Sequence, residues 1–420
     1  MKVITSLDKL NLKAYRLSDE KWYEIDDVQD LNIAETIFAE DNKELSLYQR
    51  RFGGYWRFPK LKDFCYLVNP YFPNERMISE LKSSFSTLLT QYPSGLDIQN
   101  LLAAKLFNCD DEEILVGNGA AEFIKIIFDI LPGKVGIIYP TFNEYPERAK
   151  SRIEVFVPGN GDFDYTVQEL KESSEQVENM VLINPDNPSG HFLPKADLIE
   201  LLNHLKRNNR TLILDESFVD FVEETDRFSF IDSEILEQYP NLIVIKSISK
   251  SYGVPGLRLG VLACGDRRLI AKVRKELPIW NINSFGEYFL QIIGKYKKDY
   301  WQACDRICQE RKRFYEELKK ISFLKAIPSM SNYFLCEVRQ LFTASELSRI
   351  LLKEYKILIK DCSGKEGFEH KNYVRIAVRE TTDNAFLIEQ LQCLQRTYED
   401  RSVKFGTAVE YKKEVATSFE

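Results

Sequence analysis

The chain has 420 residues with a formal net charge of −7, 44% hydrophobic and 29% charged residues, as expected for a globular protein with a sizeable core. The negative charge argues against binding to nucleic acid or to an anionic membrane, since both need a positive surface. No apolar run approaches the roughly 18 residues that cross a bilayer, and the first 20 residues lack a secretory apolar segment, so we expect a cytoplasmic protein.

The cysteines and histidines also limit the chemistry. The chain has eight cysteines, all occurring singly and none in a C-x-x-C pair, and three histidines. Cys304 and Cys308 share one face of a predicted helix, but no second pair completes a metal site, so buried thiols are the favoured interpretation. So few histidines argue against a zinc hydrolase.

The first 45 residues differ from the rest. Residues 21–38 predict a strand, a turn and a helix, and they carry four acids, Glu24, Asp26, Asp27 and Asp30. From spacing alone, these acids are interpreted as a solvated face that caps the helix.

Between about 110 and 290 the pattern is α/β. Longer amphipathic stretches, such as Ala120–Leu131 and Lys195–Arg207, alternate with short β-rich runs. Such alternation predicts a mostly parallel sheet covered by helices on both faces. The β-rich runs are Val135–Tyr139, Ile153–Val157, Met180–Ile183, Thr211–Leu214, Leu242–Ile245 and Leu259–Ala263.

The region 300–400 predicts a compact α+β unit. It begins with a long charged helix, Tyr300–Lys320, and continues through β-like runs at Tyr333–Val338 and Tyr373–Val378. Residues 398–420 are polar and are expected to form a peripheral tail.

Polar motifs follow three of the predicted strands, at Asn184–Gly190, Asp215–Ser217 and Ser247–Lys250. In open α/β sheets ligands bind beyond the carboxyl ends of the strands. The first motif is also a plain turn sequence. Asp215 emerges from a buried strand, where an acid either caps a helix or faces a buried cation such as a protonated pyridine nitrogen.

The strongest signal is the segment 247–260, SISKSYGVPGLRLG. Lys250 follows a strand and is bracketed by hydroxyls and glycines, with Arg258 eight residues later. A lysine in a dry site loses its proton more easily and can form a Schiff base with a carbonyl. Ser247, Ser249 and Arg258 supply hydrogen bonds and charge suited to a phosphate. The alternative interpretation is a loop with a surface lysine.

The segment Gly117–Glu122 opens the predicted helix 120–131. A glycine turn at a helix N-terminus presents free N–H groups to a phosphate. It is not a dinucleotide fingerprint, because the third glycine is absent, and no P-loop lysine follows.

In combination and in order, these motifs resemble the class I/II aminotransferases over roughly Phe64 to Asn384. The resemblance implies a pyridoxal 5'-phosphate (PLP) enzyme of fold type I, with a three-layer α/β/α large domain built on a mostly parallel sheet and a smaller α+β domain. It also implies no metal at the site. The implied domains are 46–90 as an N-terminal arm with part of the small domain, 91–290 as the large domain, 291–397 as the small domain and 398–420 as a tail.

The resemblance assigns a role to each matching residue. Lys250 is implied as the cofactor lysine and general base, Asp215 as the partner of the pyridine nitrogen, and Asn187 as the donor to the ring hydroxyl. Phe142 is implied to stack on the ring. The implied phosphate-binding residues are Ser247, Ser249 and Arg258 with the backbone of Gly119, Ala120 and Ala121. The implied substrate-binding residues are Asn69, Asn187, Asn332, Arg375 and Arg379.

A homodimer is also implied, in which Tyr92 is lent across the interface to the cofactor phosphate of the partner subunit.

Within the family the chain is similar to histidinol-phosphate aminotransferases and threonine-phosphate decarboxylases. Phe218 stands where many aminotransferases have a tyrosine, and Arg379 resembles the decarboxylase signature. A second guanidinium suits a substrate with both carboxylate and phosphate, although a surface salt bridge also explains it. We therefore favour decarboxylation of O-phospho-L-serine or O-phospho-L-threonine. The alternatives are an aminotransferase of the histidinol-phosphate type and a non-catalytic binding or regulatory module.

The segment Trp22–Leu31 resembles the end of nucleotidyltransferases that load choline or sugar phosphates, with Glu24 and Asp26 as part of a magnesium site. Their nucleotide-binding half is missing. Residues 1–45 are therefore interpreted as a remnant of such an enzyme, and the chain as one part of a fusion or an associate of a nucleotidyltransferase.

Overall fold

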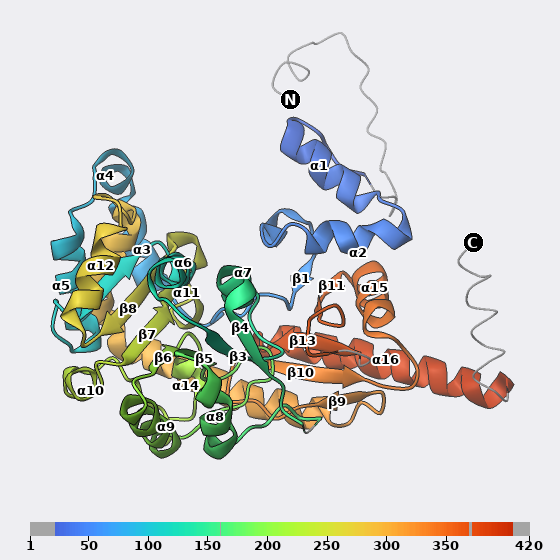
Figure 1. The fold of residues 1–420 in the computed structure, drawn as a ribbon. Helices are drawn as coiled ribbons and strands as arrows, with labels where there is room; N and C mark the ends of the chain where they lie inside the picture. Colours follow the sequence, from blue (N-terminus) through green and yellow to red (C-terminus); the bar gives the residue numbers. More distant parts are fainter. Residues whose placement is uncertain (1–21, 160, 369–371, 406–420) are drawn as a thin grey trace, which may run out of the picture. The chain divides into compact units, whose positions relative to one another are not determined.

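A computed structural model of the chain describes residues 22–405, except residues 160 and 369–371 (Figure 1). Its contacts form two compact units, one ending at Leu61 and one beginning at Lys62. The sequence places a boundary near residue 45 instead. Helix α2 spans that point and keeps residues 46–61 in the first unit.

The first unit contains two helices and a short 3-10 helix, which are α1 (Val28–Ile37), α2 (Asp41–Gln49) and η1 (Tyr55–Arg57). Tyr48 packs against Phe58 with ring centroids 4.5 Å apart, and the Tyr55 hydroxyl donates to the Tyr48 carbonyl at 3.0 Å. These aromatic contacts, together with buried Ile33, form the interior of the unit.

One of the acids before α1, Asp27, acts as its N-cap. Asp27 accepts hydrogen bonds from the N–H groups of Gln29 and Asp30 at 2.7 and 2.9 Å. Residues 22–25 form no strand, contrary to the prediction. Glu24 and Asp26 are exposed, and no group of three potential metal ligands occurs in the described part of the chain. Asp27 thus caps α1, as one of the two interpretations of these acids predicts.

The second unit is built on a seven-stranded sheet in the order β2-β8-β7-β6-β5-β3-β4. All neighbours pair in parallel except β8, which is antiparallel to both β2 and β7. Six of these strands were predicted to within two residues at each end, and β2 was not. The strands are β2 (Ile114–Gly117), β3 (Val135–Ile138), β4 (Ile153–Phe156), β5 (Asn179–Ile183), β6 (Thr211–Asp215), β7 (Leu242–Ser247) and β8 (Gly260–Cys264).

Helices cover both faces of this sheet, as predicted. Alternate residues of each strand point to opposite faces, so Val181 and Ile183 of β5 join one core and Met180 and Leu182 the other. The first core contains α6 (Ala120–Ile130), α7 (Glu144–Ala149) and α12 (Arg267–Lys275). The second contains α5 (Leu96–Phe107), α8 (Val167–Ser173), α9 (Lys195–Arg207), α10 (Ser233–Gln238) and α13 (Ser284–Ile292).

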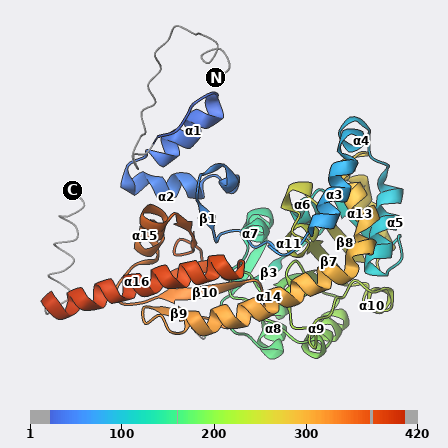
Figure 2. The same cartoon turned by 180° about the vertical axis from the view of Figure 1, so that it is seen from behind.

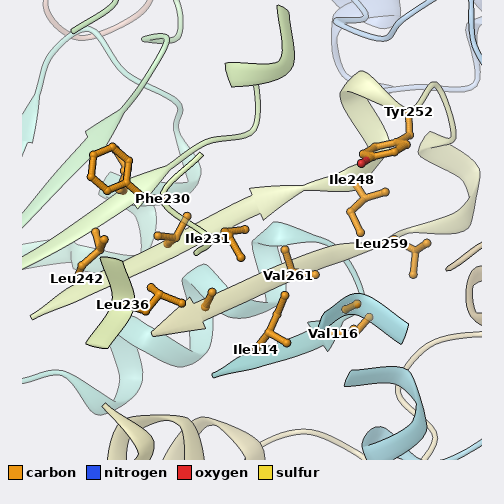
Figure 3. Close-up of a cluster of buried hydrophobic side chains, with 14 of the residues drawn as sticks. Ile114, Val116, Phe230, Ile231, Leu236, Leu242, Ile248, Tyr252, Leu259 and Val261 are labelled. Atoms are coloured by element: carbon orange, nitrogen blue, oxygen red, sulfur yellow. The ribbon is translucent and has the colours of Figure 1, made fainter. Parts of the chain in front are cut away.

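Part of the second core appears in Figure 3. Ile114 and Val116 of β2 lie beside Val261 of β8, and Leu236 of α10 lies near Leu242 of β7. Each such aliphatic side chain contributes roughly 1.5–3 kcal/mol on burial. These contacts fix the sheet whose strand ends carry the polar motifs.

A second, antiparallel sheet has the order β12-β13-β10-β9. Its strands are β9 (Leu324–Ala326), β10 (Tyr333–Val338), β12 (Lys360–Asp361) and β13 (Tyr373–Ala377). The long helices α14 (Lys297–Leu318) and α16 (Thr381–Phe405) and the shorter α15 (Ala344–Tyr355) accompany it (Figure 2). This is the predicted smaller α+β region, although α16 continues beyond residue 398, where a tail was predicted.

The remaining elements are short. A two-stranded parallel ladder joins β1 to β11. The other elements are α3 (Glu75–Ser83), α4 (Phe85–Thr90), β1 (Lys62–Asp63), η2 (Lys150–Arg152), η3 (Ser174–Gln176), η4 (Val219–Phe221), α11 (Ile248–Ser251), η5 (Pro255–Leu257), η6 (Ile293–Tyr296) and β11 (Ile357–Leu358). Within the described residues no helix is long and apolar enough to span a membrane.

Candidate active site

The site begins where two neighbouring parallel strands end. Asp215 is the last residue of β6, and Lys250 lies on the short helix α11 that directly follows β7. Asp215 is opposite Ile245 in the ladder. The two residues that the sequence singled out most strongly therefore come from adjacent strand ends, at the edge of a parallel sheet where ligands bind.

Electrostatics adapt Lys250 to act as a nucleophile. Burial, followed by the positive charges of Arg375 and Arg258, lowers its pKa from 10.5 to about 8, against the opposing effect of the Asp215 carboxylate. About a tenth of the amines are thus neutral at pH 7, far more than for an ordinary lysine. A neutral amine can attack a carbonyl carbon.

Asp215 is held by two donors. The Tyr145 hydroxyl donates to Oδ2 at 2.8 Å and the Ser217 N–H donates to Oδ1 at 2.9 Å. Burial raises the pKa of Asp215, whereas both hydrogen bonds and the charge of Lys250 lower it. A carboxylate kept ionised in this way can stabilise a buried cation. Tyr145 is fully buried, and its ring meets Phe128 edge to face at 6.2 Å.

The start of helix α6 offers a place for an anion. Its N-cap Gly119 has φ 88° and supplies no capping side chain, so the first helical N–H groups, including those of Ala120 and Ala121, lack helical partners. A Cβ on Gly119 would lie 3.0 Å from an Nη of Arg258. Arg258 therefore packs directly on this turn. The N–H of Gly119 itself donates to the Gly117 carbonyl at 2.8 Å.

Two buried serines accompany Lys250. The Ser247 N–H donates to Ser217 Oγ at 3.0 Å, and Ser249 Oγ reaches the Leu259 carbonyl at 3.5 Å, the limit of a hydrogen bond. Ser249 thus makes only a weak bond within the chain. Its hydroxyl remains suited to an added acceptor such as a phosphate oxygen.

Asn187 and Arg375 form one pair. An Nη of Arg375 donates to Asn187 Oδ1 at 2.7 Å, and its other Nη reaches the Cys65 carbonyl at 3.4 Å. The Arg375 Nε is buried, and the described residues offer it no hydrogen-bond partner. The guanidinium carbon lies 5.5 Å from the Tyr333 ring centroid. A buried donor without a partner is costly, so a ligand that supplies an acceptor here would be stabilised.

The two other predicted asparagines differ. Asn332 is completely buried, and neither atom of its amide has a partner among the described residues. This is consistent with a ligand-binding amide. The Asn69 side chain is engaged locally, since its Oδ1 accepts from the Tyr71 N–H at 3.0 Å. Asn69 reaches Lys250 through its main chain, because its N–H donates to the Lys250 carbonyl at 2.9 Å.

Arg379 follows β13. Its Nε has no hydrogen-bond partner among the described residues and lies 3.8 Å from an Asp383 carboxylate oxygen. Its main chain is fixed by Asn384, which accepts from its N–H at 2.9 Å. The side chain is 26% exposed. The Arg379 guanidinium is thus only partly exposed to solvent, and its contact with Asp383 leaves the Nε without a hydrogen bond.

Phe142 and Tyr92 are more exposed than the other candidates. Phe142 is 41% exposed and meets the ring of Tyr145 edge to face at 6.4 Å. Tyr92 is 76% exposed and stacks on Trp280 with centroids 4.4 Å apart. Tyr145 joins Phe142 to Asp215, whereas no described contact joins Tyr92 to the residues around Lys250.

Phe218 is buried against Tyr333, with ring centroids 5.2 Å apart and planes at 86°. The Tyr333 hydroxyl donates to the Asp186 carbonyl. The phenol of the ring that meets Phe218 is thus bonded to the main chain.

A buried ion pair supports the turn that bears Lys250. Lys246 Nζ lies 2.8 Å from Asp220 Oδ1, and the Ser251 hydroxyl donates to Asp220 Oδ2 at 2.7 Å. Lys246 and Asp220 are nearly inaccessible to solvent. The charge of Lys246 is the main influence that lowers the pKa of Asp220 against its burial.

We expect Lys246→Met to destabilise the protein by about 3–5 kcal/mol, because it leaves Asp220 charged and unpaired in the interior. Denaturant unfolding measures the loss. The double variant Lys246→Met/Asp220→Leu should recover most of it, since both charges are then removed. A single variant as stable as the parent would show that the pair has no structural role.

The sequence reasoning missed Tyr145, the Lys246–Asp220 pair and Lys365, whose Nζ donates to Asn143 Oδ1. A sequence signal existed for Tyr145, because it lies in the YPTFNEY segment that also supplied Phe142. The partners of the other residues come from distant parts of the chain.

Together these residues fit PLP. A lysine of lowered pKa suits the aldehyde, Asp215 the pyridine nitrogen, Asn187 the ring hydroxyl, and the start of α6 with Arg258 the phosphate. The unpartnered buried atoms of Arg375 and Asn332 leave donors for a substrate.

Known proteins resemble this chain in sequence and in fold. The family described as "aminotransferase class I and II" matches residues 74–391. The CMP-5'-(3-aminopropyl)phosphonate synthase of Streptomyces rubellomurinus is 32% identical over 89% of this chain, which spans only 59% of that protein. The L-serine phosphate decarboxylase of Sulfurospirillum multivorans is 32% identical over 80% of this chain and 90% of its own length. A solved decarboxylase structure from the same organism superimposes with a TM-score of 0.75 at 29% identity, covering 88% of this chain and 99% of that one.

Proposed function

The chain belongs to the aminotransferase class I and II family, whose members use PLP, and we propose that it decarboxylates a small phosphorylated amino acid. The observation that carries this proposal is the pair of arginines on and after β13, because Arg375 and Arg379 each have an Nε without a partner among the described residues. Two guanidinium groups match a substrate with two anionic groups, a carboxylate and a phosphate. An L-serine phosphate decarboxylase among the relatives supports this choice.

Bound PLP supplies a protonated ring that withdraws electrons from the bond being broken. The protein's own groups do the rest. Asp215 keeps the ring nitrogen protonated, and the Tyr145 hydroxyl keeps Asp215 ionised. Lys250 Nζ moves the proton that replaces the lost carboxylate on carbon. Phe218 has no hydroxyl, so Asn187 is the side-chain donor that we assign to the ring hydroxyl.

A transaminase of the histidinol-phosphate type is the second candidate. It would use the same Lys250 to move a proton from carbon, and the two reactions would differ only in which bond to the reacting carbon is broken. Phe218 offers no hydroxyl to the ring, and the hydroxyl of Tyr333, whose ring meets Phe218, is already bonded to a main-chain carbonyl. We take the missing phenol to favour decarboxylation.

We include a homodimer in the proposal. Tyr92 and Trp280 are exposed beside further apolar side chains of the same region, and Tyr92 has no described contact with its own site. A second copy of the chain would cover this surface and bring its own Tyr92 to the cofactor phosphate of the first copy. The exposed apolar side chains near Tyr92 in the chain are Phe85, Leu89, Ile98 and Leu101, with Ile279 beside Trp280.

An associated or fused nucleotidyltransferase remains a further proposal. It is supported by the resemblance of segment 22–31 and by the CMP-linked phosphonate synthase among the relatives. The phospho-amine released by decarboxylation would be a suitable acceptor for such an enzyme.

The proposal is tested by incubating the PLP-loaded protein with O-phospho-L-serine, O-phospho-L-threonine, histidinol phosphate and 2-amino-4-phosphonobutyrate, the phosphonate isostere of phosphoserine. Mass spectrometry of the products should show loss of CO2 and a phosphorylated or phosphonylated amine. A 2-oxo acid with aminated cofactor, or amino exchange with 2-oxoglutarate, would establish the transaminase instead.

Arg379→Met should lower kcat/KM for the preferred substrate roughly 10- to 100-fold, the value of a charge-assisted hydrogen bond. Unphosphorylated L-serine is the control substrate. The slow turnover of L-serine should change little, because L-serine has no phosphate that Arg379 could contact. Equal losses for both substrates would remove Arg379 from phosphate recognition.

A further inference from the structure

Lys365 connects two segments that are far apart in the sequence. It lies in the loop between β12 and β13, and its Nζ donates to the Thr141 carbonyl and to Asn143 Oδ1. These two acceptors come from the residues immediately before and after Phe142. One ammonium group thus holds the backbone on one side of Phe142 and the neighbouring side chain on the other.

The described residues next to Lys365 are firmly seated. Gly367 has φ 89°, and a Cβ on it would lie 2.9 Å from the Pro140 nitrogen, so the loop is in close contact with the segment that leads to Phe142. Phe368 is buried and stacks on Tyr373 with centroids 4.5 Å apart. The Lys365 N–H also donates to the Cys362 carbonyl at 3.0 Å. Lys365 therefore extends from a fixed base.

Phe142 has few contacts of its own. Its side chain is 41% exposed, and its one described ring contact is the edge of Tyr145. The main chain adds a bond from the Tyr145 N–H to the Phe142 carbonyl at 3.2 Å. The direction of the Phe142 ring thus depends on how firmly residues 141 and 143 are held.

Neutral oxygens are the main partners of Lys365. No carboxylate of the described residues lies within ion-pair distance of its Nζ, and the ammonium is partly buried. Burial is the main cause that lowers its pKa to about 8, and the nearby charges of Arg375 and Lys360 also lower it, whereas Asp186 opposes them. An ammonium donating to two oxygens in this setting has a strong preference for its observed position, because it would otherwise be buried without partners.

We propose that Lys365 is a positioning residue, which holds the segment 141–143 so that Phe142 is placed to stack on the cofactor ring. This inference rests on the proposed site of PLP but not on the identity of the substrate. It concerns the packing of two loops and makes no use of the bond that is broken.

The first measurement is made without cofactor. Hydrogen–deuterium exchange of peptides covering residues 140–146 should be on the order of tenfold faster in Lys365→Met than in the parent. Lys365→Arg should restore most of the protection, because a guanidinium also donates to two acceptors. Lys360→Met is the matched control, since it removes a positive charge near the same loop without removing a bond to residues 141–143, and it should leave exchange unchanged.

The second measurement is PLP affinity, taken from the visible absorbance during titration. Lys365→Met should weaken binding roughly 3- to 10-fold, the value of one aromatic stacking contact. Asn143→Ala removes one of the two acceptors of Lys365 at an exposed position, so it should weaken PLP binding by a smaller factor. This variant replaces Lys365→Met as the test if Lys365→Met does not fold.

The inference is overturned if exchange and PLP affinity are unchanged in Lys365→Met, or if Lys360→Met changes them equally. It is also overturned if Lys365→Met raises only the KM for the phosphorylated substrate, because Lys365 would then bind substrate directly. If the proposed decarboxylation fails, the exchange and PLP-affinity measurements can still be interpreted, since neither of these two uses a substrate.

Discussion

Replacing Lys250 with alanine should abolish the visible absorbance of bound PLP and lower turnover by on the order of 10⁴-fold. In the proposed site the amine of Lys250 is the group that would bond covalently to the cofactor, and it would also move the proton at the reacting carbon. Arg375, Arg258 and burial all act to keep this amine partly neutral. Lys250 is also the lysine whose positive charge acts on Asp215.

The measurement is an absorbance spectrum of the purified variant after addition of PLP. Lys250→Arg is the matched control, because it keeps the charge and much of the volume but forms no bond with an aldehyde. Both variants should lose the band and keep the circular dichroism spectrum of the folded protein. A parent-like spectrum in Lys250→Ala would disprove the assignment of the cofactor lysine.

The lowered pKa of Lys250 also predicts how cofactor loading depends on pH. Only the neutral amine attacks, and with a pKa of about 8 its fraction rises about tenfold per pH unit below that value and levels off above it. The rate at which the visible band appears should follow the same curve. Arg375→Met should move the curve to higher pH, because the positive charge of Arg375 lowers the pKa of Lys250.

Much of the fold could be predicted because its signals are local. The runs that became β3 to β8 are apolar and bounded by polar turns, and α9 begins and ends at the predicted Lys195 and Arg207. The edge strand β2 was missed, although it is as long as the predicted β3 and β4, because its last residue, Gly117, was assigned to the glycine turn that opens α6. The strand predicted near Trp22 did not form, because a β-rich run needs a neighbouring strand to pair with.

The site could be predicted in part for the same reason. Asp215 ends one buried strand and Lys250 follows the next, so the parallel sheet itself brings them to one edge. Tyr145 and Lys365 could not be predicted in this way. Their acceptors lie 70 and 222 residues away in the chain, and those contacts depend on how loops pack.

Asn69 illustrates a limit of assigning roles by resemblance. It was predicted to bind substrate, and its main chain lies beside Lys250. Its Oδ1, however, accepts from the Tyr71 N–H, and its own N–H supports the Lys250 carbonyl. A local turn uses the side-chain oxygen, so the role that the structure supports for Asn69 is to fix the Lys250 turn.

Replacing Asp215 with asparagine should lower turnover by roughly 10²- to 10³-fold, the usual cost of removing one group that stabilises charge in the reacting state. Asparagine is neutral and cannot hold the ring nitrogen in its protonated form. The variant should still bind PLP through Lys250, so its visible band remains while its activity falls. Loss of the band would instead mean that Asp215 is needed for the fold of the site.

Tyr145→Phe tests how that carboxylate is kept ionised. Burial raises the pKa of Asp215 and the bond from the Tyr145 hydroxyl lowers it, so removing the hydroxyl should raise the pKa. Because Asp215 acts in its ionised form, the acidic limb of the pH–activity profile should move to higher pH, with about a tenfold loss of activity at low pH and a smaller loss at high pH.

Tyr165→Phe is the matched control, because Tyr165 is also buried but its hydroxyl has no partner among the described residues. Deleting an unpartnered buried hydroxyl costs little, so this variant should keep the parental profile. If both variants shift the acidic limb equally, the cause is a general change in packing. If only Tyr145→Phe shifts it, the 2.8 Å bond to Asp215 sets the ionisation of the site.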